Sequence, residues 1–264
     1  MKKVGFIGTG NMGGALACAV ASSGVADVLL YDRDTEKAKA LGEKIGAAAV
    51  GLDALCAECD VIFLGVKPNI IPSLIEDIRD AVRADALVVS MAAAVDIKRI
   101  EDSFKRDVKV VRIMPNTPAS VGEGMILFAA NAAAECDIPL FLEVLAKAGT
   151  LDRLDERLID AAACISGCGP AFVYMFAEAL ADGGVACGLP RDKALLYAAK
   201  TLKGAAEVIL ESGAHPEALK DAVCSPGGTT IEGVHALETG AFRATAAEAV
   251  IAAFDKTLLM KNNK

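Results

Sequence analysis

A short hydroxyl-rich stretch, SPGGTTIEG from Ser225 to Gly233, precedes a segment whose pattern is typical of a helix. A helix start needs only one capping side chain, usually Ser, Thr, Asp or Asn. This stretch offers three hydroxyls, on Ser225, Thr229 and Thr230, beside two consecutive glycines that make the backbone flexible. The excess favours a binding site, and an elaborate helix cap is the alternative interpretation.

A second stretch, GTGNMG at residues 8–13, has the G-x-G-x-x-G spacing of a dinucleotide-binding loop. It directly follows an apolar run from Val4 to Ile7 and opens a segment of small residues, as that fingerprint requires. Gly8 permits the tight turn, Gly10 lets the backbone approach a pyrophosphate, and Gly13 lets helix and strand pack closely. The helix start then offers N–H groups to the phosphates. A glycine-rich turn without a ligand is the alternative. We expect the cofactor to contact Ile7, Gly8, Thr9, Gly10, Asn11 and Met12.

Asp32 and Arg33, at the end of the second apolar run, favour different cofactors. Asp32 follows the glycine loop by about 20 residues, where an acid grips the adenosine ribose 2′-hydroxyl and favours NAD. Arg33 can instead meet a 2′-phosphate, which favours NADP. A carboxylate facing a phosphate costs affinity unless Asp32 turns away and leaves the contact to Arg33. A solvated loop is the alternative for both residues.

Two further loops follow apolar runs, where ligands bind in open α/β sheets. In Gly65-Val66-Lys67-Pro68, the Lys67 side chain either reaches a phosphate or holds the loop through backbone carbonyls. The segment MPNTP, from Met114 to Pro118, is stiffened by two prolines and either lines a nicotinamide pocket or forms a plain turn. We expect the remaining cofactor contacts at Val66, Lys67, Pro68, Ala93 and Asn116.

The elements that must position these residues alternate over residues 1–155. Short continuous apolar runs, typical of strands covered on both faces, are separated by helical segments such as 11–23 and 35–45. This order predicts an α/β protein whose N-terminal domain is a Rossmann-type, doubly wound sheet. The predicted strands are 4–7, 28–31, 61–65, 87–90 and 108–113, with 124–129 and 149–154 at the far edge.

Residues 156–264 lack strand patterns and predict an all-helical C-terminal domain. The segments 170–185, 191–211 and 241–260 read as long helices rich in Ala and Leu, with narrow polar faces. A helix that is apolar over most of its girth is buried in a core or against another subunit. We therefore expect this domain to form much of a homo-oligomer interface.

Composition excludes several classes of partner. The net charge is −8 over 264 residues, which disfavours nucleic acid or an anionic membrane as the main partner. The N-terminus resembles a signal peptide, but Thr9, Asn11 and several glycines interrupt its apolar run. No segment without charges or breakers is long enough for a membrane span. We expect a cytoplasmic protein.

Eight cysteines are scattered along the chain, and only Cys56 and Cys59 form a C-x-x-C pair. A zinc site would need a second pair or nearby histidines, and the chain has only His215 and His235. A redox dithiol is an alternative, but the pair precedes a strand rather than opening a helix. We expect free thiols and no metal.

Five blocks of the sequence carry a family likeness that runs nearly end to end. They are GFIGTGNMGGAL, VKPNIIPSLI, RIMPNTPASVGEGM, SGCGPAFVYMFAEALADGGVACGLPR and HPEALKDAVCSPGGTTIEGVHALETGAFR. The sequence resembles pyrroline-5-carboxylate reductase, the last enzyme of proline synthesis. The resemblance implies hydride transfer from NADPH or NADH to the imine carbon of Δ1-pyrroline-5-carboxylate, with a lean to NADPH. It also implies a homodimer, with a decamer of dimers as a further assembly.

The resemblance gives the hydroxyl-rich stretch a ligand, the substrate carboxylate. Backbone N–H groups freed by Gly227 and Gly228 would point at that carboxylate, with a hydroxyl from Ser225. Family likeness assigns Thr230 a hydrogen bond to the ring nitrogen, the catalytic contact. Glu156 matches a position near the substrate that could stabilise a cationic ring nitrogen, and an exposed helix-start glutamate is its alternative. The expected substrate contacts are Ser225, Gly227, Gly228, Thr229, Thr230 and Glu156.

Three positions depart from the family pattern. Cys168 stands where the family usually has serine, and cysteine is the weaker hydrogen-bond partner. Leu52 replaces an adenosine-contacting Asn that relatives often carry. Ala222 replaces an Asn that some relatives place near the substrate. The roles of these positions are therefore open.

Two rival functions remain. A β-hydroxyacid dehydrogenase carries a catalytic lysine six residues after the first glycine of a G-x-G segment, and counting from Gly167 places Val173 there. Valine cannot remove a hydroxyl proton, which disfavours that class. A non-catalytic dinucleotide sensor would need the glycine loop but not the hydroxyl-rich stretch.

Overall fold

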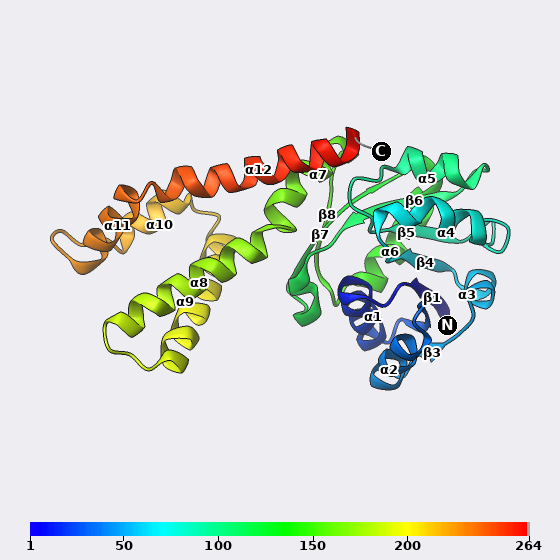
Figure 1. Cartoon of the computed structure of the whole chain (residues 1–264), viewed down its shortest axis with the longest axis horizontal. Helices are drawn as coiled ribbons and strands as arrows, with labels where there is room; N and C mark the ends of the chain where they lie inside the picture. Colours follow the sequence, from blue (N-terminus) through cyan, green and yellow to red (C-terminus); the bar gives the residue numbers. More distant parts are fainter. Residues whose placement is uncertain (263–264) are drawn as a thin grey trace. The chain divides into compact units, whose positions relative to one another are not determined.

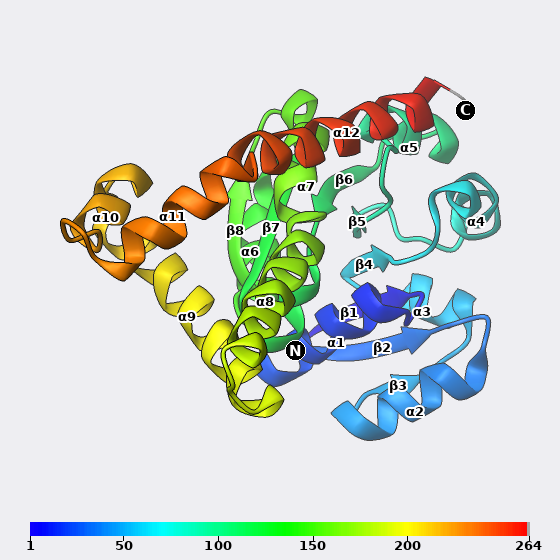
Figure 2. The same cartoon turned by 60° about the vertical axis from the view of Figure 1, so that its left-hand side comes forward.

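The computed structural model describes residues 1–262 of the chain. Contacts divide the chain into two compact units. The first comprises Met1–Gly167 together with the end of the chain from Phe254, and the second comprises Cys168–Ala253. Figures 1 and 2 show a sheet with covering helices in the first unit and only helices in the second.

One eight-stranded sheet forms the centre of the first unit, with strand order β3-β2-β1-β4-β5-β6-β7-β8. All neighbouring strands are parallel except β6 and β7, which are antiparallel. The order reverses beside β1, which creates the switch point where such sheets bind ligands. The predicted Rossmann-type fold is confirmed, including both strands at the far edge. The strands are β1 (Lys2–Ile7), β2 (Ala26–Tyr31), β3 (Ala48–Ala49), β4 (Val61–Leu64), β5 (Leu87–Ser90), β6 (Lys109–Met114), β7 (Gly124–Ala130) and β8 (Gly149–Arg153).

Helices cover both faces because the side chains of each strand alternate between two apolar clusters. Val4 and Phe6 of β1 join one cluster with Leu16 and Phe141, whereas Ile7 joins the other. The first cluster takes in α1, α2 and α6, and the second takes in α3, α4, α5 and α7. The helices are α1 (Asn11–Ser23), α2 (Thr35–Ile45), α3 (Leu52–Glu58), α4 (Ile71–Ile78), α5 (Ile97–Phe104), α6 (Ile138–Leu145) and α7 (Glu156–Ser166). Three short 3₁₀ turns are η1 (Pro68–Ile70), η2 (Thr117–Val121) and η3 (Ala132–Asp137).

The second unit is entirely helical and has very little core of its own. Its described buried side chains are three alanines, Ala181, Ala194 and Ala198, which lie on the paired helices α8 and α9. Large apolar side chains of the same helices, such as Met175 and Leu196, are more than half exposed. A chain folded in this way leaves apolar surface for a partner. The helices are α8 (Gly169–Ala186), α9 (Arg191–Ser212), α10 (Pro216–Ala222), α11 (Thr229–Thr239) and α12 (Phe242–Asn262).

The contacts divide the chain one helix later than the boundary predicted between residues 155 and 156. Helix α7 stays with the sheet because it packs on β6 and β7.

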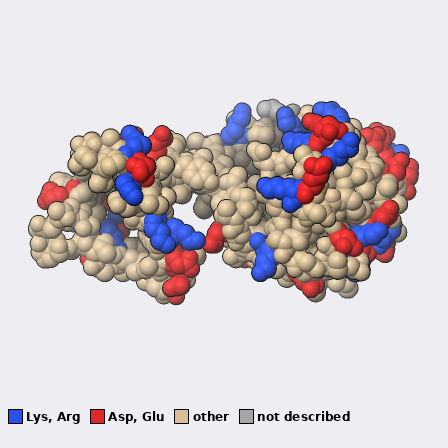
Figure 3. All heavy atoms as spheres, turned by 90° about the horizontal axis from the view of Figure 1, so that it is seen from below, with Lys and Arg blue, Asp and Glu red and all other residues tan. Residues whose placement is uncertain are grey.

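The stretch Glu156–Ala186, which joins α7 and α8, is long and apolar enough to span a membrane by length and composition alone. It contains the turn at Gly167 and Cys168 that separates the two helices. On the face shown in Figure 3, acidic and basic side chains are interspersed.

Candidate active site

The glycine loop after β1 contains the close backbone approaches that its sequence predicts. Gly8 has a φ of +100°, and a Cβ there would lie 2.6 Å from the carbonyl oxygen of Gly65. A Cβ on Gly13 would lie 2.1 Å from the carbonyl oxygen of Gly8. At Gly10, by contrast, a Cβ would meet no atom within 4 Å. Gly8 and Gly13 therefore serve packing, whereas the space beside Gly10 is open for a ligand.

Helix α1 begins at this loop without a side-chain cap. Its N-cap is Gly10, in an extended conformation, and its first turn carries no acidic side chain. The first N–H groups of α1 thus keep their donor capacity. Asn11 is exposed and Met12 partly buried at this helix start, whereas the Ile7 side chain is buried within the sheet. These features fit the diphosphate of a dinucleotide.

Asp32 is bound to the glycine loop. Its Oδ2 accepts hydrogen bonds from the Thr9 N–H at 2.7 Å and from the Thr9 hydroxyl at 2.9 Å. Its Oδ1 accepts a third bond from the Asp34 N–H at 3.0 Å. Burial would raise the pKa of Asp32, but these hydrogen bonds outweigh it and hold the pKa below its ordinary value. Asp32 therefore fixes Thr9, which is itself 5% exposed, and its contact with a ribose stays a prediction.

The other predicted cofactor contacts follow the ends of β4, β5 and β6. Because these strands run parallel to β1, their ends share one edge of the sheet with the glycine loop. Lys67 is exposed, and its ammonium makes no hydrogen bond or ion pair within residues 1–262. The interpretation in which Lys67 holds its own loop is therefore not realised here. Val66 and Ala93 are partly buried at the same edge.

Asn116 has a structural role that the sequence does not reveal. Its side-chain amide donates to the Ser166 carbonyl at 2.9 Å, and its side-chain oxygen accepts from the Met125 N–H at 2.9 Å. Asn116 is 7% exposed. It links the loop after β6 to the last residue of α7, so a direct contact with the cofactor stays a prediction.

The hydroxyl-rich stretch forms a tight turn followed by an uncapped helix. The Gly228 N–H donates to the Ser225 carbonyl at 3.0 Å, and Gly227 between them has a φ of +65°. Gly228 is the N-cap of α11, so no side chain caps that helix. The hydroxyls of Ser225, Thr229 and Thr230 are exposed and make no hydrogen bond with the described part of the chain. This arrangement weakens the interpretation as an elaborate cap, because none of the hydroxyls performs that task.

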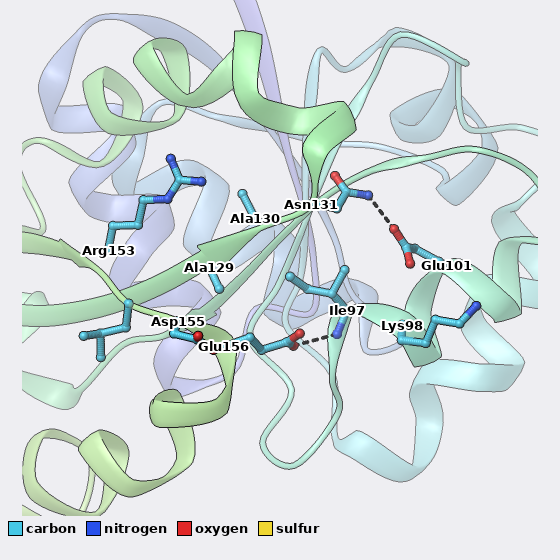
Figure 4. A pocket seen from close by; sticks show the side chains of 10 residues that line it. Ile97, Lys98, Glu101, Ala129, Ala130, Asn131, Arg153, Asp155 and Glu156 are labelled. Atoms are coloured by element: carbon cyan, nitrogen blue, oxygen red, sulfur yellow. Dashed lines mark hydrogen bonds between the residues drawn. The ribbon is translucent and has the colours of Figure 1, made fainter.

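Glu156, shown in Figure 4 with its hydrogen bond from the Ile97 N–H, belongs to a charged group centred on the buried Arg112. Glu156 Oε1 accepts from the Ile97 N–H at 2.7 Å and lies 3.4 Å from Arg112 Nη1. Arg112 is fully buried and also donates to Asp160, which in turn pairs with Lys261. Burial would raise the pKa of Asp160, but the Lys261 ammonium and the Arg112 guanidinium hold it below its ordinary value.

The charged group joins β6, α5, α7 and the end of α12. In these contacts Glu156 acts as a structural residue, and its predicted contact with substrate stays a prediction. Sequence reasoning missed Arg112 and Asp160. The signal available in the sequence was Arg112 itself, a charged residue inside the otherwise apolar run of β6. In a strand covered on both faces, such a charge is buried and needs a partner of opposite charge.

A hollow of about 540 Å³ lies beside Glu156, between α5, β7 and α7. Its polar side chains already have partners within the first unit: Glu101 accepts from Asn131, Lys98 pairs with Asp102, and Arg153 pairs with Glu135. The residues that line it include none of the predicted dinucleotide contacts. This hollow is therefore separate from the glycine loop.

The C-x-x-C pair has the chemistry of buried structural thiols. Cys56 and Cys59 are both fully buried at the end of α3. Burial raises the pKa of each thiol to about 12, and neighbouring acidic groups add to the effect. The thiolate is the form that attacks disulfides and binds metals, so this pair is poorly suited to either task at neutral pH.

The fold and the glycine loop define the class of the protein. A doubly wound sheet, an uncapped helix start beside Gly10 and loops gathered at one sheet edge are the features of a dinucleotide-dependent oxidoreductase. A family model described as pyrroline-5-carboxylate reductase dimerisation matches residues 156–260. Another, described as NADP oxidoreductase coenzyme F420-dependent, matches residues 3–94.

Individual relatives define the family. A pyrroline-5-carboxylate reductase from Escherichia coli strain K12 is 40% identical over 261 residues, which is 97% of each chain. The Arabidopsis thaliana enzyme of that name is 38% identical over 256 residues, 95% of this chain and 92% of its own. The crystal structure of Plasmodium falciparum pyrroline carboxylate reductase with NADP bound aligns with a TM-score of 0.89 at 32% identity and covers 98% of both chains. The chain belongs to the pyrroline-5-carboxylate reductase family.

Proposed function

We infer that this protein reduces the cyclic imine Δ1-pyrroline-5-carboxylate to L-proline. A bound reduced nicotinamide dinucleotide, NADPH or NADH, supplies the hydride that reaches the imine carbon, and the ring nitrogen takes a proton. Each reactant has a matching element in the chain. The loop at residues 8–13 suits the dinucleotide, and the turn at residues 225–230 suits the carboxylate of the imine.

The single observation that carries this proposal is the unsatisfied donor set of the turn. The first N–H groups of α11 have no side-chain partner, and the hydroxyls of Ser225, Thr229 and Thr230 are free within the described chain. A helix start with free donors attracts a carboxylate. Each hydrogen bond to a charged group contributes about 1.5–3 kcal/mol. Three or four such bonds would therefore hold and orient the substrate.

Thr230 is the residue that we assign to the reacting ring. Its hydroxyl would hydrogen-bond the ring nitrogen while Thr229 and the backbone hold the carboxylate. A protonated imine is already electrophilic, so orientation against the nicotinamide matters more than a strong acid. The histidines are consistent with this chemistry, because His215 accepts from the Glu217 N–H at the start of α10 and His235 is exposed within α11.

The protein is a homo-oligomer, and we propose that its basic unit is a dimer formed by the helical unit. The support is the match to the dimerisation family over residues 156–260 and the exposed apolar side chains of α8 and α9. A decamer of such dimers is the larger assembly that we propose. Light scattering at micromolar concentration tests both, and a monomer would contradict the dimer.

Steady-state kinetics with Δ1-pyrroline-5-carboxylate test the reaction. The oxidation of NADPH and of NADH is followed separately for the wild type, Thr230→Ala and Thr230→Ser. We expect turnover by the wild type, a large loss in the alanine variant and partial activity in the serine variant. Thr150→Ala is the matched control, because Thr150 is an exposed threonine on β8. Tight nucleotide binding without turnover of any cyclic imine would instead support the sensor.

A further inference from the structure

We propose that Glu156 is a positioning residue for the nicotinamide half of the dinucleotide. By accepting a hydrogen bond from the Ile97 N–H, it fixes the end of the segment between β5 and α5, residues 91–96, which we call the β5–α5 loop. This inference rests on the dinucleotide site of the proposed function. It gives Glu156 a role that differs from the substrate contact expected from the family likeness.

The β5–α5 loop begins at the edge of the sheet that carries the glycine loop. Ile7 pairs with Leu64, and Leu64 pairs with Ser90, so the parallel strands β1, β4 and β5 end side by side. A doubly wound sheet binds one nucleotide half on each side of the switch point, and the acid for the adenosine ribose follows β2. The loop after β5, which contains the predicted contact Ala93, therefore belongs to the nicotinamide side.

The hydrogen bonds that tie this loop to neighbouring elements lie at its two ends. At its start, the Met91 N–H donates to the Leu64 carbonyl at 3.3 Å. At its end, the Ile97 N–H donates to Glu156 at 2.7 Å. Between them, residues 93–96 donate no backbone hydrogen bond to another element within residues 1–262. The conformation of the loop therefore depends on how firmly each end is held.

The middle of the loop adopts a conformation that must be held in place. Ala94 has a φ of +58° and is 6% exposed. This left-handed conformation is unfavourable for alanine, because its Cβ approaches the following carbonyl oxygen, and it persists only where the surroundings impose it. Ala92 and Val95 pack in the second apolar cluster, as does Ile97. Release of Ile97 from Glu156 would leave the end of the loop to this packing alone.

Glu156 is suited to this task because its carboxylate is itself fixed. Its Oε1 lies 3.4 Å from Arg112 Nη1 and accepts from the Ile97 N–H, as Figure 4 shows for the latter contact. Arg112 is fully buried in β6 and is also paired with Asp160. A hydrogen bond to a charged acceptor is stronger than one between neutral groups. The position of β6 is thus transmitted to the β5–α5 loop through one carboxylate.

The expected consequence is specific to one half of the cofactor. Hydride transfer requires the nicotinamide ring close to the imine carbon, and a displacement of about 1 Å can cost a hundredfold in rate. A loosened β5–α5 loop should therefore weaken binding of the nicotinamide half and lower kcat. The adenosine half, on the β2 side of the switch point, should be unaffected.

Calorimetric titration of the whole dinucleotide and of its adenosine half tests the proposal without turnover. The ligands are NADP⁺ with adenosine 2′,5′-bisphosphate or, for a wild type that binds NAD⁺ instead, NAD⁺ with ADP. Glu156→Ala should weaken the dinucleotide about tenfold and change the adenosine half by no more than about twofold. Glu156→Gln should recover most of the affinity, because its amide oxygen still accepts from Ile97. Glu135→Ala is the matched control and should leave both affinities unchanged, since Glu135 also pairs with an arginine, Arg153, in the same unit.

The donor can be removed without any change to Glu156. Ile97 is the first residue of α5 and follows an extended residue, so proline fits its backbone but lacks the N–H. Ile97→Pro should reproduce the selective loss of dinucleotide affinity. Ile97→Ala loses buried packing as well but keeps the donor, and it should retain the affinity. The double variant with Glu156→Ala should be no weaker than either single variant, because both remove the same hydrogen bond.

Steady-state kinetics separate this role from a substrate contact. Glu156→Ala and Ile97→Pro should both lower kcat and raise the KM for the dinucleotide, with the KM for the imine changed by no more than about twofold. A raised KM for the imine in Glu156→Gln, with no effect of Ile97→Pro, would support the substrate contact and overturn the proposal. Equal weakening of both calorimetric ligands by Glu156→Ala, or no weakening of either, would also overturn it.

The two functions fail in different ways. A protein that shows the selective loss in calorimetry but reduces no cyclic imine would refute only the reductase function. A reductase whose dinucleotide affinity is the same in the wild type, Glu156→Ala and Ile97→Pro would refute only the positioning role of Glu156.

Discussion

The Asn116 side-chain amide donates a hydrogen bond to the Ser166 carbonyl at 2.9 Å and so joins the loop after β6 to the end of α7. The two residues are far apart in the sequence, and the same side chain also accepts from Met125. The loop MPNTP, expected to lie near the nicotinamide, is thereby tied to the residue that precedes Gly167. The position of this loop relative to the end of α7 therefore depends on one buried side-chain amide.

Asn116→Asp separates the two hydrogen bonds of this amide. The carboxylate can still accept from Met125 but cannot donate to Ser166 when ionised. We expect a loss of about 1–3 kcal/mol in the free energy of unfolding, the cost of a buried carbonyl without a partner. Urea unfolding at fixed protomer concentration measures it. Ser120→Ala, which removes an exposed hydroxyl from the neighbouring turn, is the control, and equal stability of the two variants would contradict the structural role of Asn116.

Asp32 should make stability depend on pH at the acidic end. Its pKa is lower in the folded protein than in the unfolded chain, whose value is about 3.9. Its contribution is therefore fully present above that value and is lost as the pH falls through the lower folded pKa. The difference in unfolding free energy between wild type and Asp32→Asn should shrink over this range. A difference that is constant from neutral to acidic pH would show that the ionised carboxylate does not hold Thr9.

The buried Arg112 should be sensitive to loss of its charge. Arg112→Met leaves Asp160 and Glu156 without their central cation, and breaking a buried pair in this way costs about 3–5 kcal/mol. Lys261→Met should cost much less, because Lys261 is partly exposed and Asp160 keeps Arg112. In Arg112→Met/Asp160→Leu, the combined loss should be smaller than the sum of the single losses. Strict additivity in chemical denaturation would mean that the two residues are not coupled.

Arg243 should position the substrate turn through the helices that flank it. It contacts Glu217 at the start of α10 at 2.9 Å and Glu238 at the end of α11 at 2.5 Å. Hydrogen bonds from Lys220 and Arg243 hold the pKa of Glu217 at about 2, so the contact persists across the neutral range. Arg243→Ala should raise the KM for the imine more than it lowers kcat and leave the KM for the nucleotide unchanged.

Arg243→Lys should restore part of the imine affinity, because it keeps one charged contact. Arg191→Ala is the matched control, since Arg191 forms a similar exposed pair with Asp182 in the same unit. A parallel rise in both KM values, or an equal effect of the control, would show that the ion pairs do not position the turn.

Several elements could be predicted from the sequence because their causes are local. Helices α1 and α2 begin and end at the predicted residues. Their N-caps are Gly10 and Asp34, and each helix ends at a glycine in a left-handed conformation, Gly24 or Gly46. The alternation of apolar runs with helical segments was sufficient to predict the Rossmann-type fold. The open space beside Gly10 could also be predicted, from the spacing of the glycines in residues 8–13 alone.

Tertiary structure decided which partner each polar group takes. Asp32 binds Thr9, Arg112 binds Asp160, and Asn116 binds Ser166, and no periodicity links these pairs. The antiparallel direction of β7 and the attachment of α7 to the sheet likewise depend on packing between distant segments. The sequence by itself determined the elements, the glycine loop and the hydroxyl-rich turn, because neighbouring residues set backbone conformation. Only the folded chain determined which carboxylates and amides remain free for ligands, because a buried polar group takes the nearest partner that folding brings to it.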